Sequence, residues 1–256
     1  MFRFASLGSG SRGNATLVQG GDTTILIDCG FPFREVRGRC DALGVDPDSI
    51  DALVVTHEHG DHVRGVGPTA RGLKCPVWMS HGTWRAAKYG ELPELNLFAT
   101  HEGPVNVGAL TLFPVPVPHD AREPAQFVIQ WQDTRLGLLT DLGSHTPHIV
   151  DCYLELDALL LEFNHDTVML AEGPYPPSLQ SRVGGAYGHL NNGQAAKFLS
   201  LIEHARLKHL VAAHLSEKNN TPKLAAEAIY RAVPGIQPRL SVLMQDQISG
   251  WFEITA

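Results

Sequence analysis

Residues 57–62, HEHGDH, constrain this chain most, because they place four ligand-type side chains directly after a short apolar segment. That segment, ALVVT at positions 52–56, has the length and the β-branched content of a buried strand. His57 and His59 are two residues apart, so in extended backbone they point the same way and can bind one ion. Asp61 and His62 follow Gly60, where the chain bends, and can face a second ion. Imidazole and carboxylate groups are ligands for zinc and related divalent ions, so the cluster predicts a metal site rather than a polar turn.

The spacing H-x-H-x-D-H of this cluster resembles that of the metallo-β-lactamase superfamily. That family distributes further ligands over the ends of other strands, and this chain has a residue for each position in the expected order. These residues are Asp28, His119, Asp141 and His214, spread over most of the sequence. An ordered match of this kind is far more specific than any one of its parts.

The resemblance implies a role for each of these residues. One ion would take His57, His59 and His119, and the other would take Asp61, His62 and His214. Asp141 would bridge the two ions, while Asp28 would orient a ligand histidine or the bridging water, a common task for a carboxylate beside a metal site. Asp61 and Asp28 are therefore candidate catalytic residues. The ligand types suit zinc or manganese, and iron also fits.

The order of elements favours an α/β fold. We expect strands at 2–7, 15–19, 24–28, 52–56, 77–79, 110–113, 127–131, 135–140, 158–162, 210–213, 240–244 and 251–254, and helices at 33–43, 63–71, 83–88, 192–202 and 223–231. Runs of strands with helices at intervals suit two packed sheets covered by outer helices, and the resemblance implies the four-layer αββα sandwich. We expect one domain over residues 1–256. Residues 166–188, rich in glycine and proline, are expected to form a long irregular loop beside the active site.

The composition of the chain indicates its cellular compartment and the kinds of partner it can bind. No apolar run approaches the roughly 18 to 20 residues that span a bilayer, and the first eight residues are too short and glycine-interrupted for a signal peptide. The four cysteines form no C-x-x-C pair, which favours reduced thiols, a cytoplasmic location and no membrane partner. The net charge of −7 argues against tight coating of DNA. It does not exclude a nuclease, since two cations and a local basic rim can supply the attraction.

Four polar segments point to a phosphate-containing substrate. The segment SGSRGN at 9–14 has glycines that let backbone N–H groups approach an anion, with Arg12 at its centre; the alternative is a tight, solvated hairpin. The segment NHD at 164–166 follows a strand. The segment GHLNN at 188–192 opens a helix, whose N-terminus also favours an anion. The segment HLSEKNN at 214–220 continues past the last metal position.

Together these four segments resemble the YycJ (WalJ)-like branch of the superfamily, a compact relative of RNase J without the inserted β-CASP domain. One position departs from the branch pattern, because the serine of its G-H-L-S-N motif is Asn191 here. If that serine contacts substrate, Asn191 alters the contact, although it can still cap the helix. The branch implies 5′-to-3′ exonuclease activity on DNA, particularly on single strands.

The expected reaction is therefore hydrolysis of a phosphodiester, in which a metal-bridging hydroxide attacks phosphorus. His165 and His189 would donate to the phosphate or protonate the leaving oxygen. Tyr175 and Tyr187, in the expected rim loop, are candidates for base stacking. The candidate substrate-binding residues are Ser9, Ser11, Arg12, Asn14, Asn164, Asp166, Arg182, Ser216 and Asn219.

Other functions remain open on the same di-metal scaffold. A small-molecule phosphodiesterase, a lactonase or a thioesterase would use the same ligands. A lactonase needs an apolar pocket and a donor that polarises a carbonyl, so residues 9–14 and Arg182 facing away from the metals would favour it. The intact ligand set argues against a non-hydrolytic binding protein. A redox di-iron protein normally carries a separate flavin domain, for which this chain has no residues left.

Overall fold

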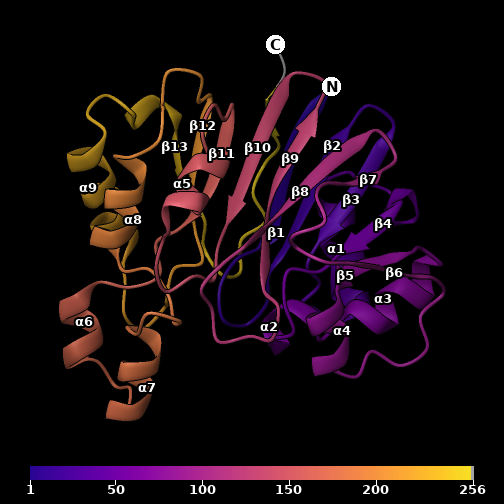
Figure 1. Ribbon diagram of the computed structural model, residues 1–256, viewed down its shortest axis with the longest axis horizontal. Helices are drawn as coiled ribbons and strands as arrows, with labels where there is room; N and C mark the ends of the chain where they lie inside the picture. Colours follow the sequence, from indigo (N-terminus) through magenta and orange to yellow (C-terminus); the bar gives the residue numbers. More distant parts are fainter. Residues whose placement is uncertain (255–256) are drawn as a thin grey trace.

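The computed structural model describes residues 1–254, which form two seven-stranded sheets packed face to face (Figure 1). The first sheet has the strand order β14-β1-β2-β3-β4-β5-β6, and the second has the order β13-β12-β11-β10-β9-β8-β7. The strands of the first sheet are β1 (Phe2–Gly8), β2 (Ala15–Gly20), β3 (Thr23–Ile27), β4 (Ala52–Val54), β5 (Val77–Ser80), β6 (Leu95–Phe98) and β14 (Phe252–Glu253). Those of the second are β7 (Val105–Val107), β8 (Leu110–Pro116), β9 (Ala125–Trp131), β10 (Thr134–Leu139), β11 (Ala158–Glu162), β12 (His209–Ala213) and β13 (Leu240–Val242).

Helices cover the outer faces of both sheets. On the first sheet lie α1 (Phe33–Ala42), α3 (Val66–Leu73) and α4 (His81–Ala86), and on the second lie α5 (Pro147–Cys152), α8 (Asn192–Leu199) and α9 (Pro222–Ala232) (Figure 1). The short α2 (Gly60–Val63) follows the histidine cluster, while α6 (Thr167–Glu172) and α7 (Pro177–Val183) project beyond the sheets. Two 3-10 turns, η1 (Pro47–Ser49) and η2 (Gln237–Arg239), complete the order. The expected αββα sandwich is thereby confirmed.

Both faces of the central strands are buried, which explains their continuous apolar runs. In β3, Ile25 belongs to the apolar layer between the two sheets, whereas Leu26 belongs to the layer under α1 and α3. A third apolar layer separates the second sheet from α5, α8 and α9. Alternating side chains of one strand therefore serve two different layers, so polar alternation is not required.

The strands β3, β4, β10 and β12, which precede most of the candidate ligands, each have a parallel neighbour, whereas β8 before His119 pairs antiparallel. Ile27 of β3 pairs with Val54 of β4 in the first sheet, and Leu139 of β10 pairs with Leu161 of β11 in the second. Ala212 of β12 also pairs with Leu161. Since parallel strands end at the same edge of a sheet, the residues that follow them meet at one end of the sandwich.

Two expectations from the sequence need correction. Residues 166–188 are not one irregular loop, because they contain α6 and α7. The strands β6 and β7 and the helix α5 were not expected at all. Each of these elements is short, and the strands lie at or beside a sheet edge, where burial on one face leaves a weak apolar pattern.

The cysteines are free thiols, with Cys29, Cys40 and Cys75 buried and Cys152 half-buried. Burial raises the pKa of Cys29 to about 12, in spite of a hydrogen bond with Thr69. None of the helices in residues 1–254 combines the length and the apolar character that crossing a bilayer requires.

Candidate metal centre

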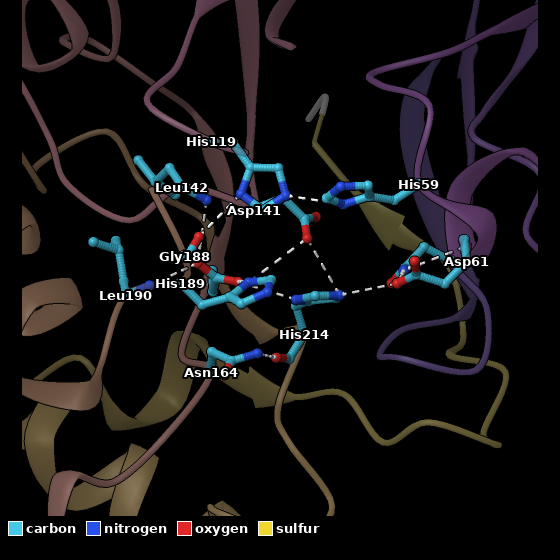
Figure 2. A network of polar contacts seen from close by, with 12 residues as sticks. His59, Asp61, His119, Asp141, Leu142, Asn164, Gly188, His189, Leu190 and His214 are labelled. Atoms are coloured by element: carbon cyan, nitrogen blue, oxygen red, sulfur yellow. Dashed lines mark hydrogen bonds and ion pairs between the residues drawn. The ribbon is translucent and has the colours of Figure 1, made fainter. Parts of the chain in front are cut away.

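The first group of donors is formed by three histidines from two loops. Ligand nitrogens of His57, His59 and His119 lie within 4.8 Å of one another. The Nε2 atom of His119 is 3.2 Å from Nδ1 of His59, as Figure 2 shows. His57 and His119 are buried, whereas His59 is half-buried at the mouth of the site.

The second group of donors is formed by Asp61, His62 and His214, which also lie within 4.8 Å of one another. One oxygen of Asp61 is 3.5 Å from Nε2 of His62 and 3.7 Å from Nε2 of His214. Asp141 reaches both histidines, with Oδ2 3.3 Å from His62 Nε2 and Oδ1 3.6 Å from His214 Nε2. It also groups with His57 of the first set. Asp141 therefore lies between the two groups, the location that its expected bridging role requires.

The histidines present one nitrogen to the centre and bind the protein through the other. The outer contacts are His57 Nδ1 with Thr56 Oγ1 at 2.9 Å, His62 Nδ1 with Asp28 Oδ2 at 2.8 Å, His119 Nδ1 with the Gly188 carbonyl at 3.0 Å, and His214 Nδ1 with Glu162 Oε1 at 3.0 Å. Contacts of this kind fix the ring orientation and the tautomer of a metal-binding histidine.

The inner nitrogens fit a cation. Within residues 1–254, His57 Nε2 and His214 Nε2 are buried and make no hydrogen bond. A buried polar atom without a partner is costly, and one cation in each donor group would satisfy the unpaired nitrogen of that group. The donor set, imidazole with carboxylate, is the set that zinc and related ions prefer. The residues present therefore fit the group that the sequence predicts.

The charges of the centre are strongly coupled. Burial and the neighbouring His62 ring lower the pKa of His57 well below its ordinary value, so His57 is a neutral donor at pH 7. Burial alone would also lower the pKa of His214, but nearby carboxylates, Asp141 first among them, raise it to about 10. Burial alone would lower the pKa of His62 too, but Asp141 and Asp28 raise it well above its ordinary value. A cation that binds His62 and His214 must therefore displace their protons.

Asp28 supports the centre from behind. Its Oδ1 accepts a hydrogen bond from the Thr56 backbone N–H at 2.9 Å, and its Oδ2 lies 2.8 Å from Nδ1 of His62. This contact matches the orienting role that the sequence predicts for Asp28. Asn14 adds a second support, because its Nδ2 donates to Asp61 Oδ2 at 3.2 Å.

Glu162 is a residue that sequence analysis missed. Its carboxylate is completely buried at the end of β11. Oε1 lies 3.0 Å from Nδ1 of His214 and 2.7 Å from Nδ1 of His189, while Oε2 accepts from the backbone N–H of Leu190 at 3.0 Å. One carboxylate thus orients a candidate ligand and a candidate catalytic histidine together. A single acidic residue ending the apolar run ALLLE was the signal in the sequence.

A cavity of about 370 Å³ opens onto the centre. Several predicted residues line it, namely Asp61, Asp141, His59 and His214 of the ligand set, His189, and Ser11, Asn164, Arg182 and Ser216 of the substrate set. Tyr175 and residues of α7 form part of its wall. The segment expected to border the active site therefore does so, although as helices rather than as a loop.

Arg182 lies on the wall of this cavity and pairs with Asp120, the residue that follows the candidate ligand His119. Its Nε donates to Asp120 Oδ2 at 2.5 Å, and the Asp120 carboxylate lies 3.5 Å from Nε2 of His59. The Arg182 side chain is 60% exposed. A solvent-exposed ion pair of this kind is weak, so substrate can displace it.

The other predicted substrate residues bind protein groups and do not line the cavity. The guanidinium of Arg12 pairs with Glu217 at 2.8 Å and with Asp246. Ser9 Oγ accepts from the His214 backbone N–H, and Asp166 caps α6 by accepting from Val168 and Met169. Asn219 donates to Ser216 Oγ at 3.2 Å. Their roles as direct substrate contacts stay predictions.

His165 also lies outside the cavity wall. Its side chain is 1% exposed, and its Nδ1 lies 3.3 Å from Asn164 Oδ1. Burial lowers the pKa of His165 to about 4. The ring is therefore neutral at pH 7, and of the two histidines expected to serve as proton donors, His189 is the one that lines the cavity.

Comparison with known proteins agrees with this site. The sequence model of the Metallo-beta-lactamase superfamily matches residues 8–161. Among curated relatives, Exodeoxyribonuclease YycJ of Bacillus anthracis is 31% identical over 229 residues, covering 88% of this chain and 87% of that protein. Exodeoxyribonuclease WalJ of Streptococcus pneumoniae strain D39 is 30% identical over 229 residues, covering 88% and 85%.

Solved structures show the same fold. The metallo-beta-lactamase fold protein YhfI from Bacillus subtilis superimposes with a TM-score of 0.74 at 16% identity, covering 97% of this chain and 99% of that chain. The chain therefore belongs to the metallo-β-lactamase superfamily. It is a metal-dependent hydrolase, and its relatives include the YycJ and WalJ exodeoxyribonucleases.

Proposed function

We propose that this protein is a 5′-to-3′ exodeoxyribonuclease that hydrolyses phosphodiester bonds of single-stranded DNA with two divalent ions, residues 1–256 acting as one domain. The observation that carries the proposal is the convergence of two donor groups, with Asp141 between them, on one open cavity. The names of the curated relatives supply DNA as the substrate class. Free thiols suit a reducing compartment such as the cytoplasm.

In this proposal His57, His59 and His119 hold one ion, and Asp61, His62 and His214 hold the other. When bound, the ions would make water reactive at neutral pH and offset the negative charge that develops on the phosphoryl group. Zinc and manganese both suit these ligands, with iron as a third choice. Asp28 and Glu162 keep the ligand imidazoles in the orientation that binding needs.

His189 is the residue we assign to the leaving oxygen. Its ring lines the cavity, and its Nδ1 is held by Glu162 at 2.7 Å, so the other nitrogen is available to a bound substrate. Burial alone would lower the pKa of His189, but the Glu162 carboxylate outweighs burial and raises it. A protonated imidazole can give its proton to the departing oxygen.

Ser11, Asn164, Ser216 and Arg182 are the residues we assign to phosphate and sugar groups, because they line the cavity. Arg182 would exchange Asp120 for a phosphate oxygen, a charge-assisted bond to a planar guanidinium. Tyr175 offers a ring on the same wall for base stacking.

A small phosphodiester is the second candidate substrate. The pairing of Arg12 and Arg182 with carboxylates favours it, because the paired carboxylates reduce the attraction of these guanidinium groups for a long polyanion. The size of the cavity also suits a small ligand.

The test is digestion of a 5′-phosphorylated, internally labelled single-stranded DNA with manganese and then with zinc. RNA of the same sequence and bis(p-nitrophenyl) phosphate are run beside it. We expect mononucleotides released from the 5′ end, and no release by Asp61→Ala, which controls for contaminating nuclease. Turnover of the small diester without cleavage of either nucleic acid would contradict the nuclease assignment and support the second candidate.

A further inference from the structure

A second cavity of about 200 Å³ adjoins the catalytic pocket and shares Leu215 and Ser216 with it. The two cavities are neighbours because β12 and β13 run in parallel, with Ala212 opposite Val242 (Figure 1). Leu215 follows the end of β12 just past His214, and Met244 follows the end of β13. Both loops therefore emerge at the same edge of the sheet, beside the metal centre.

Half of the residues that line this cavity are apolar. They are Leu215, Pro222, Leu243 and Met244. Met244 is 39% exposed, so its side chain is accessible to a ligand in this cavity. Methionine is flexible and polarisable, so it adapts to flat or irregular ligands.

Most of the hydrogen-bonding capacity of the amides beside these walls is already used. Asn220 Nδ2 donates to the Phe163 carbonyl at 2.7 Å and to Asn192 at 2.8 Å. Gln245 accepts from the Arg12 backbone N–H at 2.7 Å and donates to the Gly13 carbonyl at 3.1 Å, which leaves it one N–H for a ligand. The amides therefore offer little to the edge of a ligand, and apolar contact dominates.

A phosphate does not suit this cavity. Glu217 forms part of its wall, and the carboxylates of Glu217 and Asp246 outnumber the single guanidinium of Arg12 that pairs with both. An anion here would meet net negative charge. The Ser216 hydroxyl accepts two bonds from Asn219 and still has its own hydrogen to donate.

We propose that this cavity, which we call the base subsite, holds the nucleobase of a nucleotide next to the scissile phosphate. The inference rests on the proposed nuclease function and extends it. The phosphate lies at the metal centre, and the adjoining base lies against Met244 and Leu243 with its faces in apolar contact. Because few polar groups are left to bind the edge of the base, the subsite accepts all four bases with little sequence preference.

The experiment measures kcat/KM for the first cleavage of single-stranded DNA that carries one abasic nucleotide at the first, second or third position from the 5′ end. For the wild-type protein we expect an abasic nucleotide at one of these positions to lower kcat/KM about tenfold. A loss of this size corresponds to the apolar contact of one buried side chain. Met244→Ala should lower kcat/KM on intact DNA by about the same factor. For this variant an abasic nucleotide should lower kcat/KM no further. Met244→Leu, which keeps the apolar volume, should restore both.

The control is Leu201→Ala, which removes a similarly exposed apolar side chain outside both cavities. It should leave kcat/KM on DNA and the abasic penalty unchanged. Rates on bis(p-nitrophenyl) phosphate normalise each preparation for its content of active protein.

Two results would overturn the inference in distinguishable ways. If wild-type protein digests DNA from its 5′ end but Met244→Ala keeps the full abasic penalty, the base subsite is wrong and the proposed function stands. If wild-type protein hydrolyses the small diester and no DNA, the proposed function fails, and the base subsite fails with it.

Discussion

Asp28, Asp141 and His214 share an unusual backbone conformation, with φ between +53° and +59°. Each is the first or second residue after a strand that ends at the metal centre. For residues other than glycine this region costs roughly 1–2 kcal/mol each, and such costs gather at functional sites. Glycine would relieve the strain but would remove the candidate ligand or its support. The two packed sheets thus hold three candidate site residues in a conformation that the local chain disfavours.

The substitution Asp28→Asn removes the negative charge of Asp28 and keeps the shape of its side chain. Asparagine tolerates positive φ and can still accept from Thr56, but its amide supports His62 less well than a carboxylate does. We expect metal affinity to fall by about 10- to 100-fold, the range for a lost carboxylate partner of a ligand histidine. Equilibrium dialysis against manganese or zinc measures this change.

The matched control for that prediction is Asp22→Asn, which changes an exposed aspartate in the turn between β2 and β3. It should leave metal affinity unchanged. Equal affinity in Asp28→Asn and wild-type protein would show that Asp28 does not support the centre.

His165 gives a prediction about acid stability. Burial lowers the pKa of His165 from 6.5 to about 4, so the unfolded chain binds more protons in that window. The free energy of unfolding should therefore fall as pH drops from 6.5 towards 4, and His165 should account for up to about 3 kcal/mol of the loss.

His165→Gln does not titrate, so it should flatten this part of the pH profile. Urea denaturation of metal-stripped wild-type and variant protein at about pH 7 and about pH 5 measures the difference. A variant that loses as much stability as the wild type on acidification would contradict this account. A large loss of kcat with an unchanged profile would instead support the catalytic role predicted from the sequence.

At the scale of elements, α8 begins with a capping box. Asn191 Oδ1 accepts from the Gln194 backbone N–H at 2.9 Å, and Gln194 Oε1 accepts from the Asn191 backbone N–H at 3.0 Å. Asn191 is the position where the sequence departs from the branch pattern, and the expectation that it still caps the helix is confirmed. This helix start closely follows His189, which lines the cavity, so the geometry of the cap affects where His189 lies.

Asn191→Ala should lower the free energy of unfolding by about 1 kcal/mol, because it leaves the first turn of α8 without its cap. Asn191→Ser should recover most of that loss, since serine is also a good cap. Urea denaturation of the three proteins compares them. No difference between wild type and Asn191→Ala would mean that the cap carries no net stability.

The helices α6 and α7 could not be predicted from the pattern of apolar residues. Of their side chains only Leu170 is buried, and none in α7 is. Two short helices without an apolar face give no periodic signal, and proline and glycine around them predict a loop. The position of α7 on the cavity wall follows from the segments on either side, which end at β11 and begin at α8.

At the scale of the whole molecule, the buried strands were the easiest part of the fold to predict. The strand Ala158–Glu162 agrees with its expected bounds at both ends, since its apolar run is continuous. The strands β6 and β7 were not predicted from the sequence because they are short and only partly buried. Architecture followed from the family resemblance, as alternating strands and helices fit more than one arrangement of sheets.

The candidate ligands could be found from sequence because their spacing is local and their order along the chain is specific. The partners of other residues could not, since they come from far away in the sequence. Arg12 meets Glu217 and Asp246 only after the two sheets have packed, and Glu162 meets His189 and His214 only after β11, β12 and the segment before α8 have come together. Burial of His165 likewise depends on α8 and on the loop after β11.

The central claim is that this site binds two ions and uses both to hydrolyse a phosphodiester. The most direct test titrates manganese into metal-stripped protein while bound metal and hydrolysis of single-stranded DNA are measured in the same samples. We expect no hydrolysis without metal and a plateau at about two ions per chain, the number in a two-metal site. Full activity at one ion per chain, or activity that persists without metal, would contradict the account.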